Sequence, residues 1–206
     1  MVRAGLVVPD FSVALELLRR IDRFAESGSA ALAEFVDLLG FDKAILAAGV
    51  QEMYGSLPAD LPIFPLDGAP ELLNDLREQH QLALVTIGTS EKQMEKLKKA
   101  GIDSRIFSKI SITEQRNKKL HYQMIVDDLG YSPGEVLVCG DRISLDLTPA
   151  RELGFKTVQM RWGRGLNVSK TCGDIDYSIS KISELKGIVS SLITFSSFYN
   201  EHTPSN

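Results

Sequence analysis

Hydrophobic residues recur at helical spacing through the first quarter of the chain. Residues 12–27 are the clearest example, and Ser12 is placed to cap the helix that they predict. Two further amphipathic helices follow, one closing at Gly40 and one ending near Gly55. Three short amphipathic helices in succession predict a small helical subdomain. The apolar positions of the first helix are Val13, Leu17, Ile21 and Phe24.

The pattern changes after a proline-rich segment, "LPADLPIFPLDGAP", which is the most linker-like stretch of the chain. From Glu71 onward, amphipathic helical segments alternate with short apolar segments. Short, continuously apolar strands that alternate with helices are typical of a parallel sheet covered on both faces. We therefore predict an α/β fold with a Rossmann-like parallel sheet and a small N-terminal helical subdomain. The predicted strands are "LALVTI", "IFSKISI", "VLVCG" and "KTVQMRW", and a last helix is predicted near residues 182–194.

The composition is that of an ordinary globular protein, with 206 residues, of which 44% are hydrophobic and 24% charged. The formal net charge is -4 and the basic residues are scattered, so we expect no nucleic-acid partner. The first apolar run is too short for a signal peptide, and no run approaches the ~20 apolar residues that cross a bilayer. We therefore expect a soluble protein with no membrane partner. Cys139 and Cys172 lack metal-ligand spacing, which fits a reducing, cytoplasmic compartment. The sequence carries no signal for the oligomeric state.

Polar residues that follow the predicted strands carry the candidate chemistry, because ligands of open parallel sheets bind at the carboxyl ends of the strands. The first such end is "LALVTIGTS", where Thr86, Gly88 and Thr89 lead into a helix. Hydroxyl groups and backbone amides at the start of a helix form a site for a phosphate. A helix cap with a glycine turn explains the same residues without a ligand.

Two further strand ends supply charged groups. In "EQRNKKLHYQM", Lys118 or Lys119 would hold a phosphoryl group as a point charge, whereas two adjacent loop lysines are more often simply solvated. In "EVLVCGDRISLD", Asp141 and Asp146 offer hard oxygen ligands that suit Mg²⁺. The alternative for this stretch is ordinary turn chemistry at Asp141 and a helix N-terminus at Asp146.

These three segments, in this order on successive strands, resemble the second, third and fourth motifs of the haloacid dehalogenase-like (HAD) hydrolase superfamily, most of whose members are Mg²⁺-dependent phosphatases. The resemblance covers about Phe64 to Leu192. It implies a small phosphorylated metabolite as substrate and Mg²⁺ as cofactor. The roles that it implies are phosphate binding by Thr86, Gly88 and Thr89, a catalytic lysine at Lys118 or Lys119, and metal binding by Asp141 and Asp146.

The resemblance also predicts how the chain divides into parts. The helices that precede the sheet become the cap that members of the family insert after their first motif. Since the cap sets the substrate in such proteins and its residues here show no diagnostic pattern, the sequence does not identify the substrate. The predicted parts are a degenerate first strand of the core at 1–11, a helical cap at 12–60, an α/β core at 61–194 and a polar tail at 195–206.

The first motif of the family, an apolar strand ending in two aspartates separated by one residue, has no counterpart in the chain. In the family, the first aspartate attacks phosphorus and the second is the general acid and base. In one alignment, Leu6 matches the leucine of the motif, and Met1 and Arg3 replace the two aspartates, so the nucleophile is lost. In the other, Asp10 is the catalytic nucleophile and Ser12 stands at the acid–base position. We favour the first alignment because it leaves a more usual length for the cap and lets the first helix begin at Ser12.

The family's first strand is central in its sheet, between the strands that carry the second and fourth motifs. Without it, two strand edges would keep unpaired backbone groups, which folded domains rarely tolerate. We therefore expect residues 2–8 to form this strand in part, or residues upstream of Met1 to supply it. Two functions stay open: a phosphatase of small phosphomonoesters, and a catalytically inactive relative that binds phosphate ligands or a protein partner.

Overall fold

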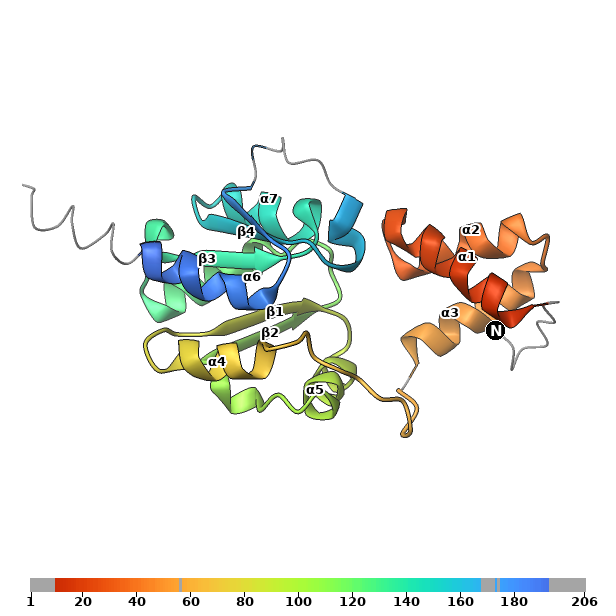
Figure 1. Ribbon diagram of the computed structural model, residues 1–206, viewed down its shortest axis with the longest axis horizontal. Helices are drawn as coiled ribbons and strands as arrows, with labels where there is room; N and C mark the ends of the chain where they lie inside the picture. The colour runs from red at the N-terminus through yellow and green to blue at the C-terminus, as the bar shows by residue number, and fades with distance from the viewer. Residues whose placement is uncertain (1–9, 56, 168–172, 174, 193–206) are drawn as a thin grey trace, which may run out of the picture. The chain divides into compact units, whose positions relative to one another are not determined.

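The described residues of the computed structural model form two compact units (Figure 1). Of the residues that the structure describes, the first unit contains those up to Leu61 together with residues 162–167, and the second contains Pro62–Arg161 and those from residue 173 onward. The strand predicted at residues 2–8 lies outside the described residues. The structure describes residues 10–55, 57–167, 173 and 175–192.

Three helices make up most of the first unit, as the hydrophobic periodicity predicts. Their apolar faces meet in a small core in which Ile21, Ala31 and Phe35 are buried. Each helix begins at a residue whose side chain accepts a backbone N–H of the first turn, which satisfies donors that have no partner within the helix. The helices are α1 (Phe11–Phe24), α2 (Gly28–Leu38) and α3 (Lys43–Tyr54), with the caps Asp10, Ser27 and Asp42.

Helix α1 is capped by Asp10, and the expectation that Ser12 caps it is wrong. One carboxylate oxygen of Asp10 accepts the backbone N–H of Ser12 at 2.8 Å and that of Val13 at 3.2 Å. The helix therefore begins at Phe11, which leaves Ser12 inside its first turn. Aspartate and serine are both strong N-caps, so a preference for residue type alone does not choose between them.

The segment after β4 returns to the first unit and is tied to α1 by Arg164. This residue lies in the short turn η5 (Gly163–Asn167). Its Nε donates to the backbone oxygen of Asp22 at 3.0 Å, and its guanidinium also pairs with the Asp22 carboxylate. Trp162, by contrast, is 60% exposed. Arg164 thus attaches the segment to α1 by specific contacts.

The second unit alternates strands and helices, and every strand pair that the structure describes in it is parallel. This confirms the α/β class with a parallel, Rossmann-like arrangement. No helix in the described part of the chain is both long and apolar enough to span a bilayer. The elements are α4 (Ala69–Arg77), β1 (Ala83–Ile87), α5 (Ser90–Lys99), β2 (Lys109–Thr113), α6 (Lys119–Leu129), β3 (Leu137–Gly140), α7 (Thr148–Arg151), β4 (Lys156–Met160), β5 (Tyr177–Ile179) and a helix over residues 185–192.

Two layers of side chains cover the strands of this unit. On one face, Tyr122 and Val126 of α6 pack with Phe155 against Val85 of β1 and Val138 of β3. On the other face, residues of β4 and β5 pack against the helix over residues 185–192. Since Val85 and Val138 touch the same buried cluster, β1 and β3 lie over the same helices (Figure 1).

Among the described residues the strands form two separate sheets, β1-β2 and β3-β4-β5. Strand β4 has a neighbour on each side and buries four of its five residues. Strands β1 and β3 have one neighbour each and bury none of theirs, and Cys139 of β3 is exposed. Strands β1 and β3 thus each keep one edge without a strand neighbour among the described residues. These are the two strands that the resemblance predicts on either side of the family's first strand.

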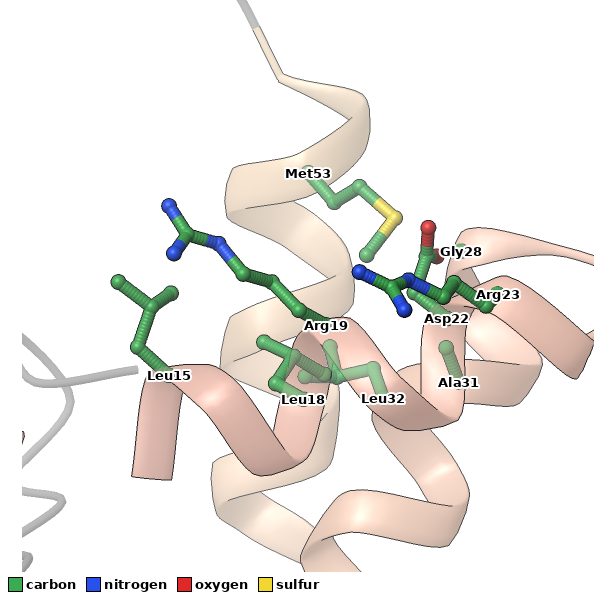
Figure 2. Close-up of a pocket in the computed structure, with 9 residues that line it drawn as sticks. All are labelled: Leu15, Leu18, Arg19, Asp22, Arg23, Gly28, Ala31, Leu32 and Met53. Carbon is green, nitrogen blue, oxygen red and sulfur yellow. The ribbon is translucent and has the colours of Figure 1, made fainter. Parts of the chain in front are cut away.

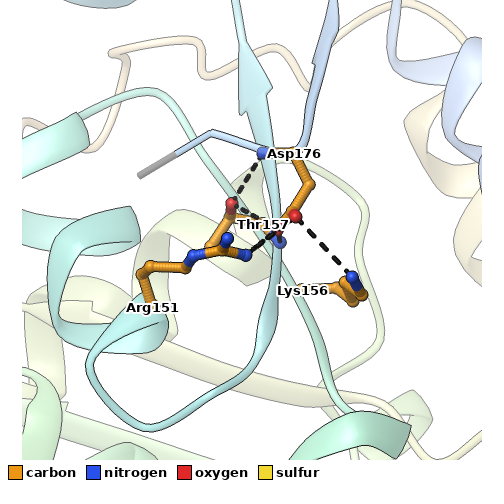
Figure 3. A network of polar contacts seen from close by, with 4 residues as sticks. All are labelled: Arg151, Lys156, Thr157 and Asp176. Carbon is orange, nitrogen blue, oxygen red and sulfur yellow. Dashed lines mark hydrogen bonds and ion pairs between the residues drawn. The ribbon is translucent and has the colours of Figure 1, made fainter. Parts of the chain in front are cut away.

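A network of polar contacts joins Asp176, the residue before β5, to β4 and α7 (Figure 3). The Asp176 carboxylate accepts the backbone N–H of Thr157 at 2.9 Å and its hydroxyl at 3.0 Å, and it accepts two bonds from Arg151 at 2.8 and 2.9 Å. Lys156 adds an ion pair at 3.7 Å. Burial acts to raise the pKa of Asp176, but the hydrogen bonds from Thr157 and Arg151 outweigh it and hold this pKa below its usual value. The network ties the start of β4 to Asp176, the residue before β5.

Replacing Asp176 by Asn should lower the free energy of unfolding by about 2 kcal/mol at about pH 7, because charge-assisted hydrogen bonds are lost. The folded pKa lies below the unfolded value of 3.8. The stabilisation is therefore fully present above that value and is lost as the pH falls through the folded pKa. Urea denaturation should show that the difference between wild type and Asp176→Asn narrows on acidification. A difference that stays constant down to about pH 2 would contradict this.

Candidate active site

A buried ion pair stands at the centre of the candidate site in the second unit. Lys118 Nζ donates to Asp146 Oδ1 at 2.6 Å, and the two side chains are only 12% and 10% exposed. Lys118 immediately precedes α6, and Asp146 lies in the turn that follows β3. Burying two charges is unfavourable unless they are paired and hydrogen-bonded, so each group depends on the other for its place.

The neighbouring lysine takes a different position. Lys119 Nζ donates to Glu152 Oε2 at 2.7 Å, and these side chains are 42% and 53% exposed. Lys119 thus belongs to a surface ion pair, while Lys118 faces the acidic group after β3. Of the two lysines that the sequence leaves open, the geometry favours Lys118 for binding an anion.

The main chain around Asp146 is held in an unusual turn. Residues Ile143–Leu147 form a π-helical turn, η4, a conformation that is frequent at functional sites. The backbone N–H of Arg142 donates to Asp146 Oδ2 at 3.0 Å, and the Tyr122 hydroxyl donates to the backbone oxygen of Asp146 at 3.2 Å. Lys118 and Tyr122 are four residues apart, so α6 directs both toward Asp146. Burial, followed by the charge of Asp146, raises the pKa of Tyr122, which keeps its hydroxyl protonated as a donor.

Gly140, the last residue of β3, leaves room for the Asp146 side chain. A Cβ on Gly140 would lie 2.5 Å from the Asp146 Cβ and 2.7 Å from its Oδ2, which real Cβ atoms essentially never do. The glycine of the "CGD" sequence is therefore required by close packing, and the carboxylate of Asp146 lies directly against the end of β3.

Asp141 is the second acidic residue of the site and carries negative charge that is only partly compensated. Burial raises the pKa of its carboxyl, and the charge of Asp146 raises it further, against the lowering effects of a backbone hydrogen bond, Arg142 and Lys118. A bound cation relieves the burial and the neighbouring negative charge that oppose ionisation of Asp141.

The loop after β1 is the candidate phosphate-binding segment. Thr86 is the fourth residue of β1 and is half-buried, and Thr89 is the exposed N-cap of α5. Gly88 has φ +147, which favours glycine. Its N–H donates to the oxygen of Thr113 in β2 at 2.8 Å, so this amide extends the sheet ladder. The donors that remain for an anion are the Thr86 hydroxyl and the first-turn amides of α5.

Sequence reasoning did not assign a role to Tyr122 or to Thr113. Tyr122 carried a usable signal, because its spacing of four residues from Lys118 places both on one helix face. Thr113 carried no such signal. Its backbone oxygen accepts the N–H of Gly88 because β1 pairs with β2 in the register that sets Ile87 opposite Thr113. Register between strands cannot be read from either strand alone.

The donor set fits a magnesium ion that keeps several waters. Mg²⁺ is usually held by one or two carboxylates together with substrate phosphate and water. Asp141 and Asp146 supply that number, although both oxygens of Asp146 already accept hydrogen bonds. Within the described ranges, no group of three or more His, Cys, Asp or Glu side chains is arranged to hold a metal. A cage made by protein ligands alone is therefore not present in that part of the chain.

The first unit contains Asp10, the remaining predicted site residue, and a hollow of its own (Figure 2). Asp10 caps α1, as described above. The hollow has a volume of about 370 Å³ and lies between α1, α2 and α3. It combines apolar side chains with two arginines, and its lining includes Leu18, Leu32, Met53, Arg19 and Arg23.

The fold and these strand-end residues define a hydrolase of the HAD type, and the comparison with protein families agrees. The family model for haloacid dehalogenase-like hydrolases matches residues 11–154. The chain therefore belongs to the haloacid dehalogenase-like hydrolase family.

Curated relatives with phosphatase activity in their names match most of the chain. A glyceraldehyde 3-phosphate phosphatase of Methanocaldococcus jannaschii is 30% identical over 201 residues, which cover 93% of this chain and 86% of the relative. One of Pyrococcus abyssi is 30% identical over 174 residues, covering 80% of this chain and 71% of the relative. The chain is thus similar to phosphatases within the family.

Solved structures agree with this assignment. The HAD-hydrolase YfnB of Bacillus subtilis, solved with bound magnesium, has a TM-score of 0.65 at 18% identity and covers 88% of this chain and 85% of its own. At that identity the likeness concerns the fold alone. A HAD phosphatase of Thermococcus onnurineus has a TM-score of 0.52 at 26% identity and covers 85% of this chain and 78% of its own.

Lys118→Met should lower the free energy of unfolding by about 3–5 kcal/mol, because it leaves the charge of Asp146 buried without a partner. The matched control is Lys119→Met, which breaks an exposed ion pair and should cost about 1 kcal/mol or less. Adding Asp146→Asn to Lys118→Met should recover part of the loss, since it removes the unpaired charge. Equal effects of the two lysine variants in urea denaturation would refute the buried pairing.

Gly140→Ala should destabilise the protein by about 1–3 kcal/mol, because the new methyl group overlaps the Asp146 side chain. Gly134→Ala is the control, since a Cβ on Gly134 meets nothing within 4 Å. Thermal unfolding of both variants checks the expectation. If Gly140→Ala is as stable as Gly134→Ala, Asp146 does not lie against the end of β3.

Proposed function

We propose that this chain is a Mg²⁺-dependent phosphatase that acts on a small phosphomonoester bound at the carboxyl ends of β1, β2 and β3. The observation that carries the proposal is the buried Lys118–Asp146 pair beside Asp141. A buried ammonium group next to two acidic groups is costly to fold, which is expected of a site kept for chemistry rather than for stability. The phosphatase names of the curated relatives support the same reaction.

Each group has a distinct role in the proposed site. The Thr86 hydroxyl and the first-turn amides of α5 donate to oxygens of the phosphoryl group. The ammonium of Lys118 neutralises part of its charge, and Asp146 holds that ammonium in place. Asp141 would be the main protein ligand of Mg²⁺, which when bound neutralises charge that develops on the phosphoryl oxygens.

The substrate proposed first is glyceraldehyde 3-phosphate or a phosphorylated metabolite of similar size. Its support is the printed activity of the relatives from Methanocaldococcus jannaschii and Pyrococcus abyssi. The net charge of -4 and the scattered basic residues support a small anionic metabolite over a nucleic acid. The cysteine usage supports a reducing, cytoplasmic setting.

A second candidate function is phosphate binding without turnover, and one contact favours it. Asp10 is the candidate nucleophile in the second alignment of the first motif. One of its carboxylate oxygens already accepts two N–H groups of α1. An attacking carboxylate must be free to approach phosphorus, so catalysis by Asp10 would require it to leave this cap. The binding groups of the second unit do not depend on that step.

The proposal is tested with the purified chain, Mg²⁺ and glyceraldehyde 3-phosphate, by following the release of inorganic phosphate. We expect turnover in the wild type and a loss of about 100-fold or more in Asp141→Asn, because metal ions contribute several kcal/mol to such transition states. Since the raised pKa means that the charge of Asp141 opposes folding, the variant should melt no lower than the metal-free wild type. Undiminished activity in Asp141→Asn would overturn the assigned role.

Calorimetry with inorganic phosphate and Mg²⁺ separates the two functions. Binding together with turnover supports the phosphatase, and binding without turnover of any phosphomonoester supports the inactive relative. Absence of both would overturn the proposed site itself.

A further inference from the structure

The peptide group between Ile87 and Gly88 is held from both of its polar ends. Its oxygen, on Ile87, accepts a hydrogen bond from Gln93 Nε2 at 2.8 Å. Its N–H, on Gly88, donates to the oxygen of Thr113 at 2.8 Å. A peptide plane that is hydrogen-bonded at both ends cannot rotate without breaking one of the bonds.

Gln93 reaches this peptide from α5, the helix that the loop itself leads into. Its own backbone N–H bonds to the oxygen of Thr89 at 3.1 Å, so one residue ties both the start and the end of the loop. The side-chain amide also lies against the Cα of Gly88. A Cβ on Gly88 would stand 2.4 Å from Gln93 Nε2, and the backbone there has φ +147. Gln93 and Gly88 therefore fit together only because the loop residue is glycine.

We propose that Gln93 is a positioning residue for the anion-binding loop, an inference that rests on the proposed function. Fixing the Ile87–Gly88 peptide fixes the direction from which the chain leaves β1. That direction sets the orientation of the next amide, on Thr89, relative to the hydroxyl of Thr86. Donors that are already oriented bind an anion without reorganising, which is the advantage of a preorganised site.

A purely structural role for Gln93 predicts a different outcome. If the hydrogen bond only joined α5 to β1, its loss would lower stability and leave the affinity for phosphate unchanged. If the hydrogen bond orients the loop, its loss lowers the affinity for phosphate even under conditions in which the variant is fully folded. The two roles are therefore separated by measuring binding and unfolding on the same variants.

Gln93→Met keeps the length of the side chain and removes the donor, and Gln93→Glu keeps the shape and replaces the donor with an acceptor. Gln123→Met is the control: Gln123 also lies in a helix, and its Nε2 donates to Asp127 Oδ1 at 2.6 Å, away from the loop. The probe is inorganic phosphate, titrated calorimetrically in the presence of Mg²⁺. Melting temperature is measured for every variant in parallel.

We expect Gln93→Met to bind inorganic phosphate about tenfold more weakly than wild type, because the loop donors lose their fixed orientation, and Gln93→Glu more weakly still, because its carboxylate repels the anion. Gln123→Met should bind as wild type does. Wild-type affinity in Gln93→Met, whatever its melting temperature, would overturn the positioning role and leave the proposed function intact. A wild type that binds no phosphate would instead overturn the proposed function, and the positioning role with it.

Discussion

The buried ion pair of Lys118 and Asp146 is the interaction on which the candidate site depends. It joins the start of α6 to the turn after β3, two segments that no regular hydrogen-bond ladder connects. The pair constrains its surroundings: Gly140 must lack a side chain, the turn takes a π-helical form, and Tyr122 donates to the same turn. Apolar replacements of buried ion pairs are often neutral or stabilising, so the proposed binding of phosphate explains this pair better than stability does.

The separation of the strands into two sheets is the second constraint. Strands β1 and β3 share one layer of helices through Val85 and Val138, yet each has a single strand neighbour among the described residues. The residues of both strands stay partly exposed, unlike those of β4. Thr86 and Asp141 come at the ends of these two strands. The precision of the site therefore depends on how well α6 and the end of β2 hold the strands in register.

Much of this fold could be predicted from the sequence because it is encoded locally. Periodicity of 3.6 residues marks the helices, and short apolar runs mark the strands. What escaped prediction depends on contacts between distant residues. Arg164 bonds to Asp22, 142 residues away, and nothing near either residue indicates it. Lys118 rather than Lys119 faces Asp146 because of where α6 begins. The Gly88 N–H bonds to Thr113 because of the register between β1 and β2. Helix caps are an intermediate case, since Asp10 and Ser12 both suit the position.

Binding and turnover are separable in this architecture. The groups that would hold a phosphoryl group all belong to the second unit, where β1, β2, β3 and α6 place them by contacts within that unit. The carboxylate that the sequence offers as nucleophile belongs to the first unit and is engaged at the start of α1. The proposed phosphate site would keep its affinity if the attacking group were lost, because none of the proposed binding groups depends on that group. Selection for binding alone would therefore preserve Thr86, Lys118 and Asp146, whereas only selection for turnover would require a carboxylate free to attack.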